Sequence, residues 1–470
     1  MSEPVVIIGA GPAGLSCANE LSACGQRIVL IDDNINAGGQ YFRQLPGSYH
    51  VTPDAKLLRD KQRFDELAKV LAKPSVHYLP STTVWGTPSP MTIAYAGRTG
   101  SGRIKAGGIV IATGAQDRSL PFTGWTLPGV MSAGGCLNLA KAHGLVPSGR
   151  VVVAGNGPLV LVAAATMIAA GANVVRVVEA QSDFRLASAA LAGLLAAPKI
   201  LGIGIGYRKR IWTSGARFQT GFMVAEAKGV YDVTSVGIAP VGFDGKPDRS
   251  RLEWIDAETL VTGYGLMPGT EAAKVFGCRM EYDAGLNGVV PSRDASLRTS
   301  ETGIYAIGDG AGIGGVEVAI LEGRIAAHAI LGSSAPSELS AGYRKLDAYR
   351  RKLNLAYRMP TALRAATDET IICRCEELSL GQILADPNRG RGSLNALKIS
   401  SRLGMGRCQG RNCLHTASAL MDLAPDAIET HPRMRPPIKP IPVGLMAADA
   451  DVGPALEPDE FNPWNSKEEQ

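Results

Sequence analysis

The chain has 470 residues, 45% of them hydrophobic, which is enough for two or three domains with their own cores and excludes a disordered protein. The formal charge of +5 is spread thinly and only 6% of the residues are aromatic, so the chain lacks the dense basic and stacking clusters that bind nucleic acid. The N-terminal apolar run is short and ends at glycines, which predicts a strand rather than a signal peptide, and hence a cytoplasmic protein with reduced thiols.

The N-terminal segment PVVIIGAGPAGLSCANELSACGQRIVLIDD has the strand, glycine turn, helix and strand order of a dinucleotide-binding unit. Gly9, Gly11 and Gly14 match G-x-G-x-x-G, in which the glycines allow a tight turn, close approach of a pyrophosphate and close helix packing. Pro12 and Ala13 begin the helix whose N-terminus would face the phosphates. Asp32 ends the second strand eighteen residues after Gly14, where a carboxylate binds ribose hydroxyls, and Asp33 is the alternative.

Three later segments fit the same pocket. A buried strand ends at Ala112, Thr113 and Gly114, and a second strand ends at Gly308 and Asp309, whose carboxylate would hold a ribityl or phosphate-side hydroxyl. The turn AGGQYFRQ supplies further candidates, namely Gly39, Gln40 and Arg43. Over about the first 335 residues the chain resembles the FAD-binding and NAD-binding domains of the glutathione- and thioredoxin-reductase class.

The chain departs from that class in its cysteines. Cys17 and Cys24 are seven residues apart on the first helix, and Cys136 and Cys278 have no near partner, so a dithiol beside the flavin is not expected. We interpret these four as small buried apolar residues.

A second unit, RVVVAGNGPLVLVAAATMIAAGANVVRVVEA, repeats the pattern with Gly155, Gly157 and a terminal Glu179. Its third glycine position is Val160, which should hold the helix away from the strand. We therefore favour a retained scaffold without a working nucleotide site, while NAD binding stays open as the alternative. The apolar segment 186–198 beyond this unit is expected in the core, and its exposure would instead indicate a subunit interface.

Four cysteines near the C-terminus form two close pairs, Cys373 with Cys375 and Cys408 with Cys413. Paired thiolates are typical of metal sites, and both zinc and a [2Fe–2S] cluster accept four cysteines. Basic residues and glycines surround both pairs, and these favour iron–sulfur because they stabilise a reduced cluster. They are Arg374, Lys398, Arg402, Arg407, Arg411, Gly404, Gly406 and Gly410.

The segments ETIICRCEE and GMGRCQGRNC resemble the bacterioferritin-associated-ferredoxin-like [2Fe–2S] domain. Together with the two nucleotide units and the linking segment LPFTGWTLPGVMSAGG, they make the whole chain resemble the α subunits of heteromeric flavin-dependent amine dehydrogenases. That group includes the A subunit of opine oxidase, the larger hydrogen cyanide synthase subunit, and the α subunits of D-hydroxyproline, L-proline and sarcosine oxidising complexes.

The resemblance implies an oxidoreductase acting on CH–NH bonds in which the work is divided between subunits. A catalytic FAD-containing β subunit would oxidise the amine or amino acid, and some relatives add a small γ subunit. The α subunit would carry FAD or another adenine nucleotide, the [2Fe–2S] cluster and, at the boundary with the β subunit, FMN. It would pass electrons to an acceptor. We assign no catalytic residue in this chain, and no membrane span is expected, although peripheral membrane association is left open.

The expected fold class is α/β, with two Rossmann-like domains and a small helical cluster domain. The predicted boundaries are residues 1–118 and 285–335 for the FAD domain, 119–284 for the second Rossmann domain, 336–364 for a helical linker, 365–425 for the cluster domain and 426–470 for an extended tail. The tail is rich in proline and then acidic, so it is expected to be disordered or to lie across a partner through Val443, Leu445, Met446 and Trp464.

Two other functions remain open. A self-sufficient NADH-dependent ferredoxin-type reductase would use Glu179 to bind ribose. A zinc-stabilised scaffold protein would use the four cysteines without redox chemistry.

Overall fold

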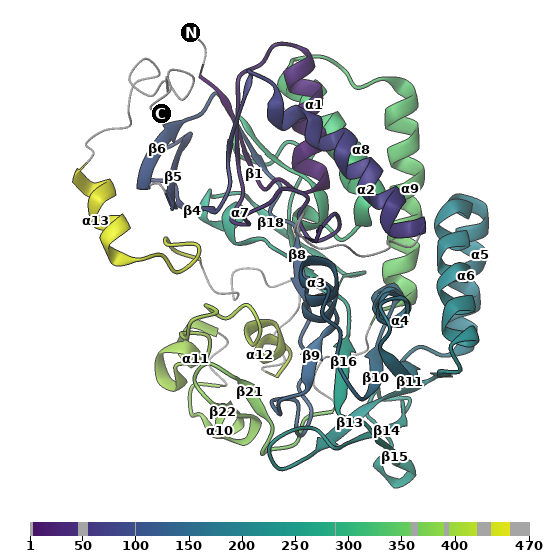
Figure 1. Ribbon diagram of the computed structural model, residues 1–470. Coiled ribbons are helices and arrows are strands. Elements are labelled where there is room, and N and C mark those ends of the chain that lie inside the picture. The colour runs from purple at the N-terminus through teal and green to yellow at the C-terminus, as the bar shows by residue number, and fades with distance from the viewer. Residues whose placement is uncertain are drawn as a thin grey trace.

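A computed structural model describes residues 3–45, 55–98, 100–286, 288–358, 365–389, 394–420 and 434–451 (Figure 1). Two parallel sheets dominate it, one in each of two stacked α/β domains, and a small cysteine-bearing module lies beside the second domain. The predicted α/β fold class is confirmed. No helix in the described part of the chain has both the length and the apolar character needed to cross a bilayer.

The first domain is built on a five-stranded parallel sheet whose strands read as short runs of aliphatic residues. In order across the sheet they are β20 (Ile304–Ala306), β7 (Gly108–Ile111), β1 (Val5–Ile8), β2 (Ile28–Ile31) and β3 (Val76–Leu79). Alternate side chains point to opposite faces of a strand. Val5 and Ile7 therefore pack on the helices, and Val6 and Ile8 pack on the opposite side.

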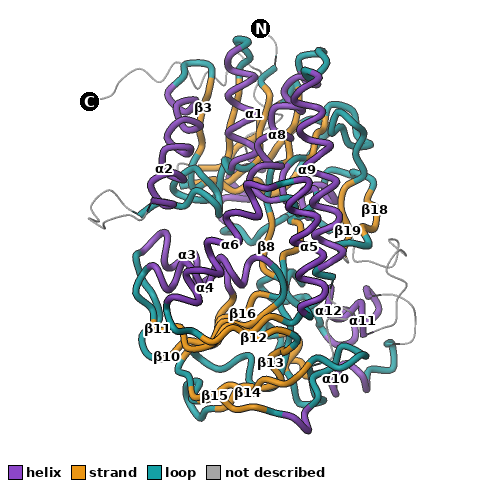
Figure 2. Tube along the Cα trace, turned by 90° about the vertical axis from the view of Figure 1, so that its right-hand side faces the viewer, coloured by secondary structure: helices purple, strands orange, loops and turns teal. Residues whose placement is uncertain are grey.

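Helices cover one face of this sheet and a small antiparallel sheet covers the other (Figures 1 and 2). The helices on the first face are α1 (Pro12–Ala23), α2 (Ala55–Ala68) and α8 (Gly315–Ile330), and the domain also contains the 3₁₀ turns η1 (Lys69–Ala72) and η3 (Gly308–Ala311). The short helix α7 (Glu271–Val275) packs on the other face, with the antiparallel sheet. The antiparallel sheet contains β4 (Thr82–Gly86), β5 (Thr92–Gly97) and β6 (Gly100–Lys105).

The second domain repeats the design. Its parallel sheet has the order β12 (Arg217–Thr220), β11 (Asn173–Glu179), β10 (Arg150–Gly155), β16 (Thr259–Gly263) and β9 (Val130–Ser132). Its helices are α3 (Ala133–His143), α4 (Pro158–Ala169), α5 (Asp183–Ala196) and α6 (Pro198–Thr213), and the turn η2 (Arg249–Arg251) precedes its last antiparallel strand. The antiparallel strands β13 (Phe222–Lys228), β14 (Ser235–Pro240) and β15 (Glu253–Asp256) cover the other face.

Two short antiparallel ladders join the domains. They are β8 (Ala115–Asp117) with β17 (Leu266–Pro268), and β18 (Met280–Asp283) with β19 (Gly288–Pro291). The division expected after residue 284 falls inside the second ladder. Ala272, Ala273 and Phe276 already pack in the core under the first sheet, so the chain returns to the first core before this hairpin.

Helix α9 (Ser337–Ala356) spans both domains. Leu339 near its start lies in the first domain's core, and the residue after its end, Tyr357, covers the glycine turn of the second domain. Between them the Tyr349 hydroxyl would lie 3.1 Å from a Cβ placed on Gly193 of α5, so the helix also packs closely on the α5–α6 hairpin.

The cysteine module has a small core of its own. Its elements are β21 (Ile371–Cys373), β22 (Leu378–Ser379), α10 (Leu380–Ala385), α11 (Leu394–Ser401) and α12 (Leu414–Leu420). Ile372, Ile383, Leu397 and Leu403 are buried with Cys373 and Cys413, so the thiols are part of the packing. Helix α10 begins with a capping box in which Ser379 and Gln382 exchange hydrogen bonds with the backbone.

Two expectations are corrected by packing. The apolar segment 186–198 is not core throughout, because Leu191 and Leu194 of α5 are exposed. Part of the described tail packs on the first domain. Ile438 is buried in that domain's core, and its N–H donates to the Trp85 carbonyl. Helix α13 (Val443–Asp451) follows it and leaves Val443 exposed, while Trp464 lies outside the described residues.

Candidate functional site

The first glycine turn is sterically tight. Gly9 has φ +112°, and a Cβ there would lie 2.3 Å from the Ala112 carbonyl oxygen. A Cβ on Gly14 would lie 1.9 Å from the Gly9 carbonyl oxygen. At Gly11 the nearest atom is 3.8 Å away, so the middle glycine is needed for something other than protein packing, as a close phosphate would require.

The carboxyl ends of four parallel strands bring the predicted residues together. The turn after β1 contacts Ala112, which follows β7. A Cβ placed on Gly308, which follows β20, would lie 3.0 Å from the Cβ of Ala13, the second residue of α1. Helix α1 begins at Pro12, directly after the turn, so its first N–H groups face the turn. No side chain caps this helix, so these groups are free to bind a phosphate. The structure thus gathers these candidates at one edge of the first sheet.

Asp32 is buried and already engaged. Its Oδ2 accepts from the Ala10 N–H at 2.6 Å, and its Oδ1 accepts from the N–H and the side-chain amide of Asn34, each at 2.8 Å. Burial raises the pKa of this carboxyl, partly offset by these hydrogen bonds. An oxygen of a carboxylate has two lone pairs, so Oδ2 can accept one more hydrogen bond, as a ribose hydroxyl would supply.

Asn34 was not predicted, and it links Asp32 to a second candidate. The Arg43 Nη2 donates to the Asn34 Oδ1 at 3.1 Å, while the Arg43 Nε is buried without a hydrogen-bond partner among the described residues. A buried guanidinium N–H without a partner is costly unless a ligand accepts from it. This orphaned donor, beside a turn that has room for phosphate, fits an adenine nucleotide.

The remaining candidates of the second strand and the following turn differ in position. Gly39 has φ +59°, and its ideal Cβ would lie 2.9 Å from the Cα of Gly11, so it lines the glycine turn. Gln40 is exposed. Asp33 is exposed and forms an ion pair with Lys439 of the tail, whereas Asp32 is buried beside the glycine turn, so Asp32 is the better candidate of the two.

Three further candidates follow strands of the first sheet. Thr113 and Gly114 come after β7, and Asp309 comes after β20. The Thr113 hydroxyl donates to the Gly269 carbonyl at 2.7 Å, and Gly114 adopts φ +68° with open space around it. Asp309 Oδ1 accepts from the N–H groups of Gly314 and Gly315 at 2.8 and 2.9 Å. These two bonds use one oxygen of the carboxylate, which leaves its Oδ2 available to a hydroxyl of a bound cofactor.

Sequence reasoning missed the residue that holds Gly308. Glu322 of α8 is fully buried, and its Oε2 accepts from the Gly308 N–H at 2.6 Å and from Arg293 Nη1 at 3.1 Å. Tyr343 of α9 donates to its other oxygen at 3.1 Å. These partners are distant in sequence, so no local motif indicated them.

The second glycine turn is closed by the chain itself. Glu179 is buried, and its two oxygens accept from the N–H groups of Gly157 and Gln181, each at 3.0 Å. The Asn156 side chain donates to the Tyr357 carbonyl, and the Tyr357 ring would lie 3.6 Å from a Cβ on Gly157. A dinucleotide would need this carboxylate and this space.

Val160, which we expected to displace the helix, is buried and packs over Gly263 of β16. The missing side chain on that neighbouring strand makes room for it. The closure by Tyr357 is therefore the stronger physical argument that the second fold is a scaffold.

Burial makes Glu179 a source of pH dependence. It raises the pKa of this carboxyl from 4.5 to about 7, against the effect of its backbone hydrogen bonds. The folded protein then binds more protons than the unfolded chain between these pH values, so the free energy of unfolding should fall by up to about 3 kcal/mol as the pH rises through this interval. Glu179→Gln should flatten that slope in denaturant titrations at a series of pH values.

The same substitution at the exposed Glu281 provides the control. A slope that is equally steep in Glu179→Gln and in the unmodified chain would show that Glu179 is ionised in the folded state.

The four C-terminal cysteines form two interacting pairs. The Cys413 thiol donates a hydrogen bond to the Cys373 sulfur. The same sulfur also accepts from the N–H groups of Gly404, Glu376 and Cys375. Together these hydrogen bonds lower the pKa of Cys373 to about 5. The Cys408 N–H donates to Cys375, although partial burial and the Cys408 thiol raise the pKa of Cys375 overall.

All four thiols interact electrostatically, and the hydrogen bond to Cys373 together with burial raises the pKa of Cys413. Within the described residues no three His, Cys, Asp or Glu side chains are grouped so that a single ion could bind between them. A [2Fe–2S] cluster takes four cysteine thiolates, so the donor set of two facing pairs fits such a cluster.

The glycines of this module are required by packing. A Cβ on Gly406 would lie 2.2 Å from the Cβ of Cys375, and one on Gly410 would lie 2.1 Å from the Leu414 side chain. Gly404 and Gly410 also have φ values of +75° and +80°. The loop can therefore approach both cysteine pairs only because these positions have no side chain.

Most of the nearby basic side chains have other partners. Arg374 lies over the Trp125 ring at 5.1 Å, Arg402 pairs with Glu376 at 2.8 Å, and Arg411 pairs with Glu271 at 3.0 Å. Lys398 interacts electrostatically with Cys413, and burial lowers the pKa of this lysine. The predicted positive environment is thus partly used to dock the module.

Both cysteine segments are tied to the nucleotide-binding domains. The Trp125 indole N–H donates to the Ile371 carbonyl at 2.6 Å, two residues before Cys373. The Gln116 amide donates to the Arg411 carbonyl at 3.3 Å, and Arg411 Nη1 donates to the Cys408 carbonyl at 3.2 Å. Glu271 begins α7 two residues after Gly269, the partner of Thr113, so one short route of contacts joins the first pocket to the cysteine loop.

Removing the Arg411 side chain should loosen this joint. Arg411→Met removes the ion-pair partner of the mostly buried Glu271 carboxylate and leaves it only the electrostatic interaction with Lys274, which should destabilise the docked module by about 3 kcal/mol. Hydrogen exchange in segments 371–373 and 404–413 should become faster. The double variant Glu271→Gln/Arg411→Met should recover part of the protection, since the hydrogen bonds from Arg411 to the Cys408 and Ile438 carbonyls stay lost, and equal exchange in the single and double variants would contradict the role of the pair.

The fold and the first glycine turn define a flavin-dependent oxidoreductase of the two-dinucleotide-domain type. The chain belongs to the family described as pyridine nucleotide-disulphide oxidoreductase, whose profile matches residues 3–323. The predicted resemblance to this class is confirmed.

Curated relatives extend the similarity through the C-terminal module. The chain is 33% identical to the A subunit of opine oxidase from Agrobacterium tumefaciens (strain Ach5), covering 94% of this chain and 91% of the relative. It is 31% identical to the hydrogen cyanide synthase subunit HcnB from Pseudomonas protegens, covering 94% and 97%. Both relatives are named as subunits, one of an oxidase and the other of a synthase.

The fold is also similar to that of a solved structure, L-proline dehydrogenase from P. horikoshii. The TM-score is 0.65 at 19% identity, over 94% of this chain and 79% of that chain. At this identity the match supports the arrangement of domains and not a substrate.

Proposed function

We propose that this chain is the electron-transferring α subunit of a heteromeric flavin-dependent amine or amino-acid dehydrogenase, of the opine, hydroxyproline, proline or glycine type. In this proposal the first glycine turn binds FAD or another adenine nucleotide, Cys373, Cys375, Cys408 and Cys413 hold a [2Fe–2S] cluster, and FMN binds at the boundary with a catalytic FAD-containing β subunit. A small γ subunit could complete the complex.

The observation that carries the proposal is the docking of the two cysteine pairs beside the first nucleotide pocket. Gln116 and Glu271 both contact Arg411, which lies between Cys408 and Cys413, and both lie within two residues of the pocket loops at Gly114 and Gly269. A module that only stabilised the fold would not need to place its ligand loop at this pocket.

Each residue then has a defined task. Gly11 would leave room for the phosphates, and the N-terminus of α1 would face them. Asp32 and Arg43 would bind the adenosine part of the cofactor. Asp309 would bind a ribityl or phosphate-side hydroxyl. The cluster, when bound, supplies one-electron transfer. N–H donors near the sulfurs, such as that of Gly404, would stabilise its reduced form.

The NADH-dependent alternative is disfavoured by the closed second turn. Glu179 is occupied by two backbone N–H groups and Tyr357 covers Gly157, so NADH should not bleach the flavin rapidly in an anaerobic stopped-flow experiment. The zinc-scaffold alternative makes a different prediction about the metal.

The deciding test is anaerobic purification of the chain with whatever co-purifies, followed by assays of iron and acid-labile sulfide and by EPR after dithionite reduction. We expect about two irons per chain and a rhombic signal of about one spin. One zinc and no iron would overturn the electron-transfer role, and substrate oxidation by the chain without a partner would overturn the division between subunits.

A further inference from the structure

The α5–α6 hairpin exposes large apolar side chains together with basic ones. The apolar residues are Phe184, Leu191, Leu194, Ile203, Ile205 and Trp212. Phe184 is 83% exposed and Trp212 is 79% exposed, and several exposed large apolar side chains on one segment are informative where a single one would not be. We refer to these six residues and the basic side chains among them as the hairpin surface.

Charge on the hairpin is mostly positive, although Asp183 at its start interacts electrostatically with Arg208. Residues 184–225 contain no Asp or Glu, and they contain six basic residues, namely Arg185, Lys199, Arg208, Lys209, Arg210 and Arg217. Asp183 lies at the start of α5, and the next acidic residue along the chain is Glu226. The segment therefore carries a charge of +6 in a chain whose total is only +5.

The hairpin lies at the outer edge of the second domain (Figure 1). One side of it packs on α4 and α9, whereas a Cβ placed on Gly202, Gly204 or Gly206 of α6 would meet no atom within 4 Å. Phe184, Leu191 and Leu194 recur at helical spacing on one side of α5, and Ile205 and Trp212, seven residues apart, share one side of α6. No described part of the chain covers these side chains.

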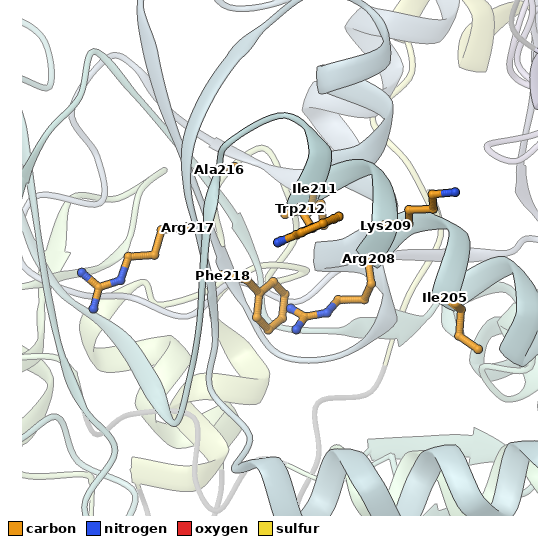
Figure 3. Close-up of a pocket in the computed structure, with 8 residues that line it drawn as sticks. All are labelled: Ile205, Arg208, Lys209, Ile211, Trp212, Ala216, Arg217 and Phe218. Carbon is orange, nitrogen blue, oxygen red and sulfur yellow. The ribbon is translucent and has the colours of Figure 1, made fainter.

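A groove of about 560 Å³ opens at the end of α6 (Figure 3). Trp212, Ile205 and Phe218 line it together with basic side chains, and the Arg208 guanidinium lies 3.5 Å from the centre of the Phe218 ring. Arg217 also lines the groove, but its side chain extends away from Trp212 and Phe218 and lies 3.9 Å from Glu253. Apolar and cationic groups are thus interleaved within one concave surface.

We propose that the hairpin surface docks this protein on an anionic phospholipid membrane. Helices that lie in a membrane interface present large apolar side chains flanked by Lys and Arg, and Trp is favoured at that depth. The stems of Arg208 and Lys209 can lie along the apolar layer while their charges reach lipid phosphates. The groove beside Trp212 would receive a phosphate-bearing headgroup and the upper part of its acyl chain.

Exposure of the segment 186–198 by itself indicates a subunit interface, but the basic charge among the apolar side chains favours an anionic membrane over a protein partner. Lys is depleted at the centre of protein interfaces, where Trp and Arg are enriched, whereas here Lys209 lines the same groove as Trp212 and Arg208. This inference is independent of the proposed electron-transfer role.

The test uses the full chain with whatever co-purifies, and vesicles of phosphatidylcholine alone or mixed equally with phosphatidylglycerol. We expect sedimentation with the anionic vesicles only, reversed by about 0.5 M salt. Arg208→Gln/Lys209→Gln should weaken partitioning by roughly 25-fold, at about fivefold per charge, and Trp212→Ser by roughly tenfold. Phe243→Ser, at a fully exposed aromatic residue outside the hairpin, is the matched control and should bind normally.

A second readout reports on depth. Vesicles with brominated acyl chains should quench tryptophan fluorescence, and Trp212→Phe should abolish the quenching while retaining vesicle binding. Failure to bind anionic vesicles, equal losses in Trp212→Ser and Phe243→Ser, or a change of oligomeric state or loss of a co-purifying protein in Trp212→Ser would overturn the proposal. The last outcome would assign the hairpin surface to a protein interface.

Discussion

Gly14→Ala should destabilise the first domain by about 3 kcal/mol or more and abolish retention of a nucleotide. The added methyl group would lie 1.9 Å from the Gly9 carbonyl oxygen and 3.3 Å from the Ile7 side chain. The obstacle is backbone, which cannot rotate away as a flexible side chain could. Helix α1 would have to move off β1 and carry its N-terminus away from the phosphate position.

Two further substitutions separate folding from binding. Gly342→Ala, in the interior of α9 where no atom lies within 4 Å, should be neutral or stabilise by roughly 0.5–1 kcal/mol. Gly11→Ala meets no protein atom closer than 3.8 Å, so the domain should fold, but the methyl group would occupy the phosphate approach and nucleotide content should fall. Thermal unfolding and bound-nucleotide analysis of the three variants provide the measurements. A Gly14→Ala protein as stable as Gly342→Ala, and with full nucleotide content, would contradict the tight turn.

Cys373→Ser should remove the iron and the EPR signal while leaving the first-domain cofactor in place. The Cys373 sulfur accepts from the Cys413 thiol and from the Gly404 and Glu376 N–H groups, and its pKa is about 5, so it is the thiol best prepared to be a thiolate ligand. A serine hydroxyl is not deprotonated at neutral pH and cannot replace it. We expect iron content to fall more than tenfold from about two per chain.

The matched control is Cys24→Ser, which changes an exposed thiol beyond the end of α1. Iron content, the EPR signal and the visible cofactor spectrum should all be unchanged in that variant. Retention of iron in Cys373→Ser would exclude Cys373 as a ligand. Loss of the cofactor and of the fold together would show that the metal supports the whole chain.

The parts of the site that lie within short segments could be predicted. The spacing of Gly9, Gly11 and Gly14 indicated a tight turn. The atoms nearest to a Cβ on each of these glycines belong to the same strand–turn–helix unit or to the segments that follow the adjacent strands, so the local sequence was enough to predict it. The spacing within each cysteine pair likewise pointed to two close thiols. The pairing across the module, Cys373 with Cys413 and Cys375 with Cys408, depends on the fold of the segment between them.

Other features depended on contacts that no local pattern contains. Asp32 and Asp33 are equivalent candidates by sequence, and they are distinguished only because Ala10 and Asn34 engage one while Lys439 pairs with the other. The apolar segment of α5 could have been core or surface, and its exposure follows from the packing of α9 along one side of it.

The sequence by itself determined the class of fold, the glycine turn of the first pocket and the two cysteine pairs, because each follows from the geometry of a few consecutive residues. Only the tertiary structure decided that Tyr357 closes the second glycine turn, that Glu322 holds Gly308 and that Arg411 joins the cysteine loop to the first pocket. The physical reason is that such hydrogen bonds and ion pairs are short-range forces between residues distant along the chain. Their partners are established only once the two sheets and α9 have packed.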